Sequence, residues 1–211
     1  MKRYIKKFLV IVLVIAASSC SEDFLETSPT NAVSPNDALS TPANMMVALN
    51  GIHRTMYSQS PLSGYSYAGE GFVLPYIEFP GSDALHTTSG NGWFRSAIQW
   101  IAHTDPNRFD MGWVWYHYYH IIGSVNAIIN AAEEGEMVED ELLSNVLGQA
   151  KAYRAFAHFR LVTLWAPNYI HGNPTSDLGV PIMLATADPY EGQVRKTVSE
   201  VYAQIEKDLD E

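Results

Sequence analysis

The residues whose chemistry stands out lie in one glycine-rich stretch, from Asp83 to Arg95. In this stretch Trp93 follows Gly92, and Asn91 adds a planar amide. Flat aromatic rings can stack on the apolar C–H faces of neutral sugars, while planar polar side chains pair with neighbouring hydroxyl groups. The combination suits a sugar-binding loop. In the competing interpretation, Trp93 packs into the core and Asp83 caps a turn.

Other aromatic residues offer weaker candidates. Tyr65 and Tyr67 form a possible second stacking platform in a glycine-flanked segment. Five more rings crowd the start of one predicted helix: Trp113, Trp115, Tyr116, Tyr118 and Tyr119. Aromatic residues at helical spacing usually form core, so we expect these five to be mainly structural.

Carboxylates and histidines raise two further possibilities, a glycosidase and a metal site. Glu70, Glu78 and Asp83 could supply the paired carboxyl groups of a glycosidase, but spacing along the chain does not reveal their separation in space. No nucleophile elbow, phosphate-binding glycine loop or dinucleotide fingerprint is present. His117 and His120 lie three residues apart, with His103 and Asp105 upstream, but no HExxH motif or cysteine cluster accompanies them. We therefore expect no enzyme, no metal and no cofactor.

The amino terminus has the layout of a secretory signal. Four basic residues precede a short apolar run that ends at Ser18-Ser19-Cys20. A membrane-spanning helix needs roughly 20 apolar residues, and this run is too short. The ending Ala17-Ser18-Ser19-Cys20 resembles a bacterial lipobox, and Cys20 is the only cysteine of the chain. We predict that residues 1–19 are removed and that Cys20 carries the lipid.

The predicted mature chain is acidic. Removing residues 1–19 takes four of the 13 basic residues and none of the 23 acidic ones, which leaves 9 against 23 and a net charge of −14. Such a surface repels nucleic acid and anionic lipid headgroups. Attachment to a membrane must then come from the lipid, and more than one acyl chain is required for firm anchoring.

Hydrophobic spacing and caps predict a mainly α-helical body after a polar tether over residues 20–40. Thr41-Pro42 opens a helix to about residue 58, and residues 59–107 are expected to be mostly irregular because glycine and proline interrupt them. Asp110 is a plausible cap for a helix to about residue 132, whose apolar stripe is Trp115, Tyr118, Ile122, Val125 and Ile129. We expect the acidic residues after this helix, up to Glu141, to form a solvated loop.

A second long helix and a capped third one follow. The second has the apolar positions Leu142, Val146, Tyr153, Ala157, Leu161 and Leu164, and it ends before Pro167. The short loop before it predicts an antiparallel pair. A connector over 167–196 contains one strand-like run, residues 180–184. Thr197-Val198-Ser199-Glu200 is a capping box for a helix with Val198, Val201, Ile205 and Leu209 on one face. Because the sequence stops inside that helix, we expect a carboxy-terminal part to be missing.

Three helix motifs resemble the SusD-like (RagB) family. They are Trp115-xx-Tyr118-xxx-Ile122-xxx-Asn126, Gln149-Ala-Lys-Ala-Tyr-Arg-Ala-Phe156, and Arg195-xx-Val198-xx-Val201-Tyr202-xx-Ile205-xx-Asp208-Leu209. Phe24-Leu25-Glu26 behind Cys20 and the lipoprotein signal add to the likeness, which covers the whole chain. Gln149 stands where the family commonly has glutamate.

The resemblance implies a fold of tetratricopeptide-like helical hairpins with a long irregular insertion. Residues 41–211 would form the amino-terminal helical domain, with 110–166 as the first hairpin and 197–211 as the start of the second. The family places ligand contacts in the loop that corresponds to residues 83–95, so Asp83, Asn91, Trp93 and Arg95 are the expected ligand-binding residues. Part of the family's sugar site comes from a carboxy-terminal half that this sequence lacks.

The resemblance also implies a location and partners. The family is lipid-anchored and surface-exposed on the outer membrane of Gram-negative bacteria, and it delivers oligosaccharides to a TonB-dependent, SusC-like transporter. Ser21-Glu22-Asp23 resembles its acidic export signal. The expected function is thus non-catalytic glycan binding, with no nucleic-acid partner. The alternatives are a tetratricopeptide-type scaffold that binds protein and, with less support, a surface glycosidase.

Overall fold

The computed structural model describes residues 35–57, 69–81, 87, 92–101, 103–105, 107–135, 137, 140–185 and 191–211. The chain divides into two compact units, residues 1–37 and 38–211. The short helix α2 (Pro35–Ala38) lies at the boundary, and the second unit contains the remaining helices. Cys20, Tyr65, Tyr67, Asp83 and Asn91 lie outside the described residues, so their predicted roles remain predictions from sequence.

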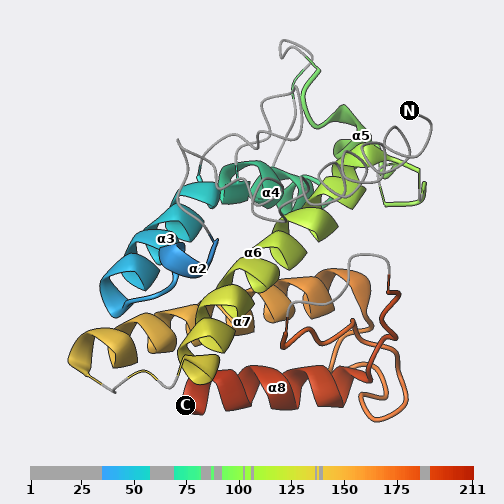
Figure 1. The fold of residues 1–211 in the computed structure, drawn as a ribbon. Coiled ribbons are helices and arrows are strands. Elements are labelled where there is room, and N and C mark those ends of the chain that lie inside the picture. Colours follow the sequence, from blue (N-terminus) through green and yellow to red (C-terminus); the bar gives the residue numbers. More distant parts are fainter. Residues whose placement is uncertain are drawn as a thin grey trace, which may run out of the picture. The chain divides into compact units, whose positions relative to one another are not determined.

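Two long antiparallel helices form the centre of the second unit. Helix α6 (Phe109–Glu134) packs along α7 (Glu141–Trp165), and α7 also contacts α8 (Val198–Asp210) (Figure 1). The loop before α7 was expected to be solvated. Its last residue, Asp140, also binds the start of α7, because its side chain accepts a hydrogen bond from the amide of Leu143 at 2.7 Å. Thr197 and Glu200 form the predicted capping box of α8. None of the helices in the described part of the chain is long and apolar enough to cross a bilayer.

Helix α3 (Pro42–Thr55) covers one side of the α6–α7 hairpin. Its start agrees with the prediction: Thr41 is the N-cap, its hydroxyl oxygen accepts from the amide of Asn44 at 3.2 Å, and Pro42 occupies the first turn. Three of the four predicted apolar positions, Met45, Leu49 and Ile52, are buried and join the core of α6 and α7. The amphipathic pattern therefore identified the buried face of this helix correctly.

The expectation that residues 59–107 are mostly irregular was wrong for two segments. Helix α4 (Gly69–Glu78) and the short helix α5 (Arg95–Ile98) lie within this range. Helix α4 forms although Pro75 lies inside it and cannot donate a backbone hydrogen bond. Burial of Phe72 and Val73 compensates for the missing bond, because tertiary contacts outweigh local propensity.

Three smaller predictions also need correction. Asp110 does not cap α6, because the helix begins at Phe109 and Arg108 occupies the N-cap position. Leu142 and Leu209, which were assigned to apolar faces, are exposed at helix ends. Residues 180–184 form no strand; in the described part of the connector, Leu178 forms an antiparallel bridge with Thr197.

The connector before α8 is instead held by side-chain hydrogen bonds, some from the hairpin and some from its own Arg195. The hydroxyl of Tyr119 donates to the carbonyl of Pro181 at 2.8 Å, and the amide of Asn126 donates to the carbonyl of Met183 at 3.0 Å. Arg195 donates to the carbonyl oxygens of Gly179 and Trp165. These hydrogen bonds pair backbone carbonyl groups of the connector that a neighbouring β-strand would otherwise pair.

Candidate functional site

The turn before α5 presents Trp93 and Arg95, the two predicted ligand-binding residues that the structure describes. Gly92 has a φ of 80°, and Phe94, the N-cap of α5, has a φ of 59°. Trp93 lies between these two left-handed residues and is 46% exposed. Arg95, the first residue of α5, is exposed as well. The structure therefore brings Trp93 and Arg95 to one surface turn.

Trp93 lies at the rim of an aromatic cluster centred on Phe72 of α4. The Phe72 ring contacts Phe94 at 4.9 Å, Trp113 at 5.6 Å and Trp93 at 6.5 Å between ring centroids. Phe72 and Trp113 are buried, so the indole of Trp93 rests on the core without being enclosed by it. A ring supported on one side and open on the other can stack on a ligand at little entropic cost.

The first turn of α4 is fixed in place by polar contacts with the hairpin. The hydroxyl of Tyr118 donates to Glu70 Oε2 at 3.2 Å, and the guanidinium of Arg160 donates to the Tyr118 hydroxyl at 3.0 Å. His117 Nε2 lies 3.5 Å from Glu70 Oε1. Burial of the Tyr118 hydroxyl, together with the Glu70 charge, raises the pKa of this phenol far above its usual range. The group remains protonated and able to donate at any physiological pH.

Gly69 lets α4 begin against the end of α3. A Cβ atom at this position would lie 2.1 Å from the carbonyl oxygen of Met56, and Gly69 has a φ of 45°. The next amide, that of Glu70, donates to the same carbonyl at 2.7 Å. Only glycine combines this conformation with so close an approach. The aromatic cluster thus depends on one glycine for its position.

The candidate carboxylates of a glycosidase do not form a described pair. The Glu70 carboxylate contacts Tyr118, Arg160 and His117. Glu78 is exposed at the other end of α4, and Asp83 lies outside the described residues. In the described part of the chain, the contacts of Glu70 are those of an ionic anchor between helices.

The candidate metal ligands make stacking contacts. The His117 ring stacks on Trp113, and that of His120 stacks on Tyr116 at 5.7 Å between centroids. Burial, and then the neighbouring His117, lower the pKa of His120. Among the described residues no three histidine, cysteine or acidic side chains group closely enough to hold a metal ion.

The five aromatic residues at the start of α6, which were expected to be mainly structural, divide between core and surface. Trp113 and Tyr118 are buried, Trp115 and Tyr119 pack partly against the core, and Tyr116 is exposed. The Trp115 ring contacts that of Trp165 at 5.1 Å across the hairpin. These rings mainly hold α6 to its neighbours.

Trp100, which the sequence analysis did not single out, ends α5 in an unusual conformation. The amide of Trp100 donates to the carbonyl of Ala97 at 3.0 Å, and the amide of Ile101 donates to that of Ser96 at 2.9 Å. This pair of bonds is the Schellman motif, whose left-handed position is normally glycine. Here it is Trp100, with a φ of 57° and 59% exposure. A bulky residue in this conformation costs about 1–3 kcal/mol.

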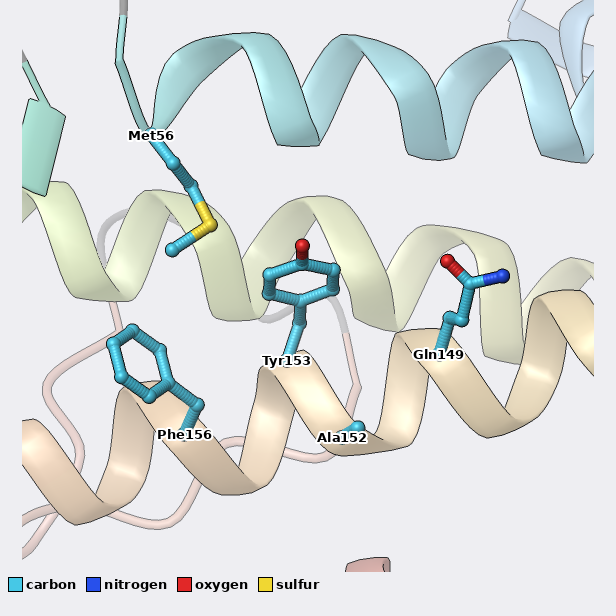
Figure 2. Close-up of a pocket in the computed structure, with 5 residues that line it drawn as sticks. All are labelled: Met56, Gln149, Ala152, Tyr153 and Phe156. Atoms are coloured by element: carbon cyan, nitrogen blue, oxygen red, sulfur yellow. The ribbon is translucent and has the colours of Figure 1, made fainter.

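An apolar hollow of about 460 Å³ lies between α3 and α7 (Figure 2). Its lining comprises Met56, Gln149, Ala152, Tyr153 and Phe156. The Gln149 amide donates to Asn145 at 2.6 Å, and the Tyr153 ring contacts that of His53 at 5.0 Å. The hollow presents two aromatic rings and few polar atoms, which suits contact with another apolar group.

A sequence profile of the family described as "Starch-binding associating with outer membrane" matches residues 23–211, almost the whole chain. The chain belongs to the SusD-like family. SusD-like protein P2 of Formosa agariphila is 30% identical over 166 residues, which are 78% of this chain and 30% of that protein.

Solved structures of the SusD superfamily share the fold. A member from Bacteroides fragilis superposes with a TM-score of 0.69 at 21% identity, over 83% of this chain and 39% of that one. A putative sugar-binding protein from Bacteroides vulgatus gives 0.65 at 25% identity, over 80% and 35%. The chain therefore spans about a third of the length of these relatives.

The motifs that carried the SusD-like resemblance hold the helices together. Arg154 of the second motif donates to Asn126 of the first and to Asp208 of the third. All three side chains are buried. In this SusD-like chain the motifs thus encode the packing of α6, α7 and α8, whereas the exposed turn around α5 lies outside them.

Proposed function

We propose that this SusD-like chain binds glycans at the bacterial surface without cleaving them. The observation that carries the proposal is the half-exposed indole of Trp93, supported by Phe72 and Phe94 and followed by the exposed Arg95. An open ring beside a planar donor is the arrangement that a neutral sugar requires. Asp83 and Asn91 complete the proposed contacts on the strength of the sequence.

The relatives support a sugar as the ligand. A putative sugar-binding protein and a SusD-like carbohydrate-binding protein, both from Bacteroides vulgatus, share the fold at 25% and 24% identity. The family description names starch binding in association with the outer membrane. The engagement of Glu70 by Arg160 and Tyr118 supports binding without hydrolysis, because this carboxylate is held as an ionic anchor.

The same proposal includes the location of the protein. Residues 1–19 are removed as a signal, Cys20 carries acyl chains such as palmitate, and residues 20–40 tether the helical domain to the outer membrane. There the protein captures oligosaccharides and delivers them to a TonB-dependent transporter. The acidic mature sequence favours attachment through lipid over attachment through a basic surface.

Calorimetric titration of the full chain with a panel of soluble oligosaccharides tests the proposal. Trp93→Ala should weaken binding by up to about tenfold, since ring stacking contributes about 0.5–1.5 kcal/mol. Tyr116→Ala is the matched control, because Tyr116 is 42% exposed on α6. It should bind as the wild type does. Chromatography of the incubated sugar should show no shorter products.

Two results would contradict the proposal. If Trp93→Ala remains folded by circular dichroism and binds normally, the turn is structural and the sugar binds elsewhere. If the sugar is shortened during incubation, the protein is an enzyme.

The hollow between α3 and α7 favours a second candidate, a helical scaffold that binds protein. Met56, Tyr153 and Phe156 offer the apolar lining that an inserted side chain would occupy. Capture of the transporter from detergent-solubilised outer membranes would test this role. Loss of the transporter with Phe156→Ala, while glycan binding persists, would assign the hollow to a protein partner.

A further inference from the structure

Two hollows lie in succession along one face of α7. The first, of about 520 Å³, is at the start of the helix and is lined by Asp140, Glu141, Leu142 and Asn145. The second is the apolar hollow between α3 and α7. Gln149, from the lining of the second, donates to Asn145, from the lining of the first, at 2.6 Å. This hydrogen bond shows that the two hollows adjoin and form one groove.

The floor of the groove is made of small residues. Gly148 and Ala152 are exposed and lie four residues apart, so they share a face of α7. A Cβ atom on Gly148 would meet nothing within 4 Å. Small side chains let a second helix approach closely. From Asp140 to Phe156 the groove follows α7 for about 24 Å at 1.5 Å per residue, which is enough for about four turns of a partner helix.

The apolar walls of the groove are held in place from behind. Figure 2 shows Met56 pointing from the end of α3 toward α7, with Tyr153 and Phe156 pointing from α7 toward α3. The Tyr153 ring contacts that of His53 at 5.0 Å between centroids, and the Phe156 ring contacts that of Tyr118 at 6.2 Å. Rings that are restrained before binding lose little entropy when an apolar side chain inserts between them.

The start of the groove is strongly acidic. Residues 133–141 contain six acidic residues and no basic one. The partial positive charge at the amino terminus of α7 is about half a unit, less than the charge of Asp140 and Glu141 together. The three basic residues of α7 already pair with carboxylates of the chain: Lys151 with Glu211, Arg154 with Asp208 and Arg160 with Glu70. The surface therefore attracts a basic partner and repels an anionic membrane.

We propose that the groove along α7 binds a basic amphipathic helix of a partner protein. Apolar side chains of that helix, spaced three and four residues apart, enter the hollow between Met56, Tyr153 and Phe156. Its basic side chains face Asp140 and Glu141. The inference deepens the second candidate function, protein binding, and is independent of glycan binding at Trp93.

The experiment measures binding of a fluorescent synthetic peptide to the full chain by polarisation. The peptide has leucines along one helical face and lysines along the other. One control peptide has the same composition in scrambled order, and a second has glutamate in place of lysine. The wild-type chain should bind the first peptide at least about tenfold more tightly than either control, a difference of 1.4 kcal/mol.

Two pairs of variants separate the groove from general attraction to an acidic protein. Ala152→Trp fills the groove and should weaken binding at least about tenfold, whereas Ala203→Trp, at an exposed position of α8, should bind as the wild type does. Glu141→Gln should weaken binding about threefold, and the exposed Glu206→Gln of α8 should have a smaller effect. If Ala152→Trp fails to fold by circular dichroism, Gly148→Gln replaces it, since its side chain enters open space.

Four results would overturn the inference. The first is equal binding of the ordered and scrambled peptides, and the second is undiminished binding by a folded groove-filling variant. The third is a dimer of the chain that Ala152→Trp abolishes in sedimentation, because the groove then belongs to a second copy. The fourth is loss of peptide binding in a longer form of the protein that retains residues 41–211, because the groove is then covered by its own chain. Oligosaccharide titration of Ala152→Trp should give the wild-type affinity, so the glycan proposal stands or falls separately.

Discussion

Arg154 of α7 and Asp208 of α8 form a buried ion pair with two parallel hydrogen bonds. Arg154 Nε lies 2.9 Å from Asp208 Oδ2, and Arg154 Nη2 lies 2.6 Å from Asp208 Oδ1. The remaining guanidinium nitrogen donates to Asn126 of α6 at 3.0 Å. One guanidinium therefore joins three helices and sets the register of α8 against the hairpin.

Breaking this pair from the acidic side should be costly. Asp208→Asn leaves the Arg154 charge buried without its counter-charge, and we expect the free energy of unfolding to fall by about 3–5 kcal/mol. Urea denaturation followed by circular dichroism measures the change. The control is Glu211→Gln, which removes the surface pair with Lys151 and should have little effect. Equal effects of the two variants would mean that the buried pair has no special structural role.

Stability should fall in mild acid because of His158. Burial lowers the pKa of this side chain from 6.5 to about 4, although Asp208 and the carbonyl of Arg154 oppose the shift. The neutral ring can donate from Nδ1 to the carbonyl of Arg154 and accept at Nε2 from the amide of Met183. Between pH 6.5 and 4 the unfolded chain binds more protons than the folded one, so stability decreases as the pH falls.

The expected loss from His158 is about 3 kcal/mol on going from above pH 6.5 to pH 4. Urea midpoints measured at several pH values should show a shallower pH dependence for His158→Gln than for the wild type. His171→Gln, which changes an exposed histidine, should retain the wild-type slope. An unchanged slope in His158→Gln would assign the acid sensitivity to other groups.

Two glycines of α4 should respond oppositely to alanine. Gly69→Ala places a methyl group against the carbonyl of Met56 in a left-handed backbone, whose cost alone is about 1–2 kcal/mol. Gly71→Ala, two residues later, meets nothing within 4 Å and should stabilise the helix by about 0.5–1 kcal/mol. Thermal unfolding of both variants provides the comparison. Similar losses in both would show that α4 does not start as closely against α3 as described.

Cys20 should be the sole acylation site, because the sequence contains no other cysteine. Cys20→Ala should abolish incorporation of a radioactive fatty acid and leave the protein uncleaved or released from the membrane. Ser19→Ala is the matched control, because it keeps a small residue before the thiol. Label in Cys20→Ala at the wild-type level would contradict the prediction.

Helix starts with local caps were predictable, whereas two helices inside the glycine-rich segment were not. Thr41 and the Thr197–Glu200 box satisfy free amides within three residues, so their signal is contained in the local sequence. Gly69, Gly71 and Pro75 indicate a loop when considered locally. The α4 helix forms because Phe72 and Val73 enter a core built by α6, which lies far away along the chain.

The candidate site, too, was predictable from the local sequence only in part. Trp93 was identified by its residue type and its glycine neighbour, but its half-exposed position depends on Phe72 and Phe94. Trp100 was missed because the rule for the left-handed end of a helix expects glycine. No local sequence pattern predicts a tryptophan at the left-handed position that ends a helix.

The sequence by itself determined the family, the acidic charge and the buried faces of the long helices, because caps and apolar periodicity act over a few residues. Only the tertiary structure decided that Arg154 meets Asp208, 54 residues away, and that Gly69 meets the carbonyl of Met56. The tertiary structure also decided which tryptophan side chains remain exposed to solvent. These features depend on how distant helices pack around one core, and a single buried residue such as Phe72 can outweigh the local preference of its own segment.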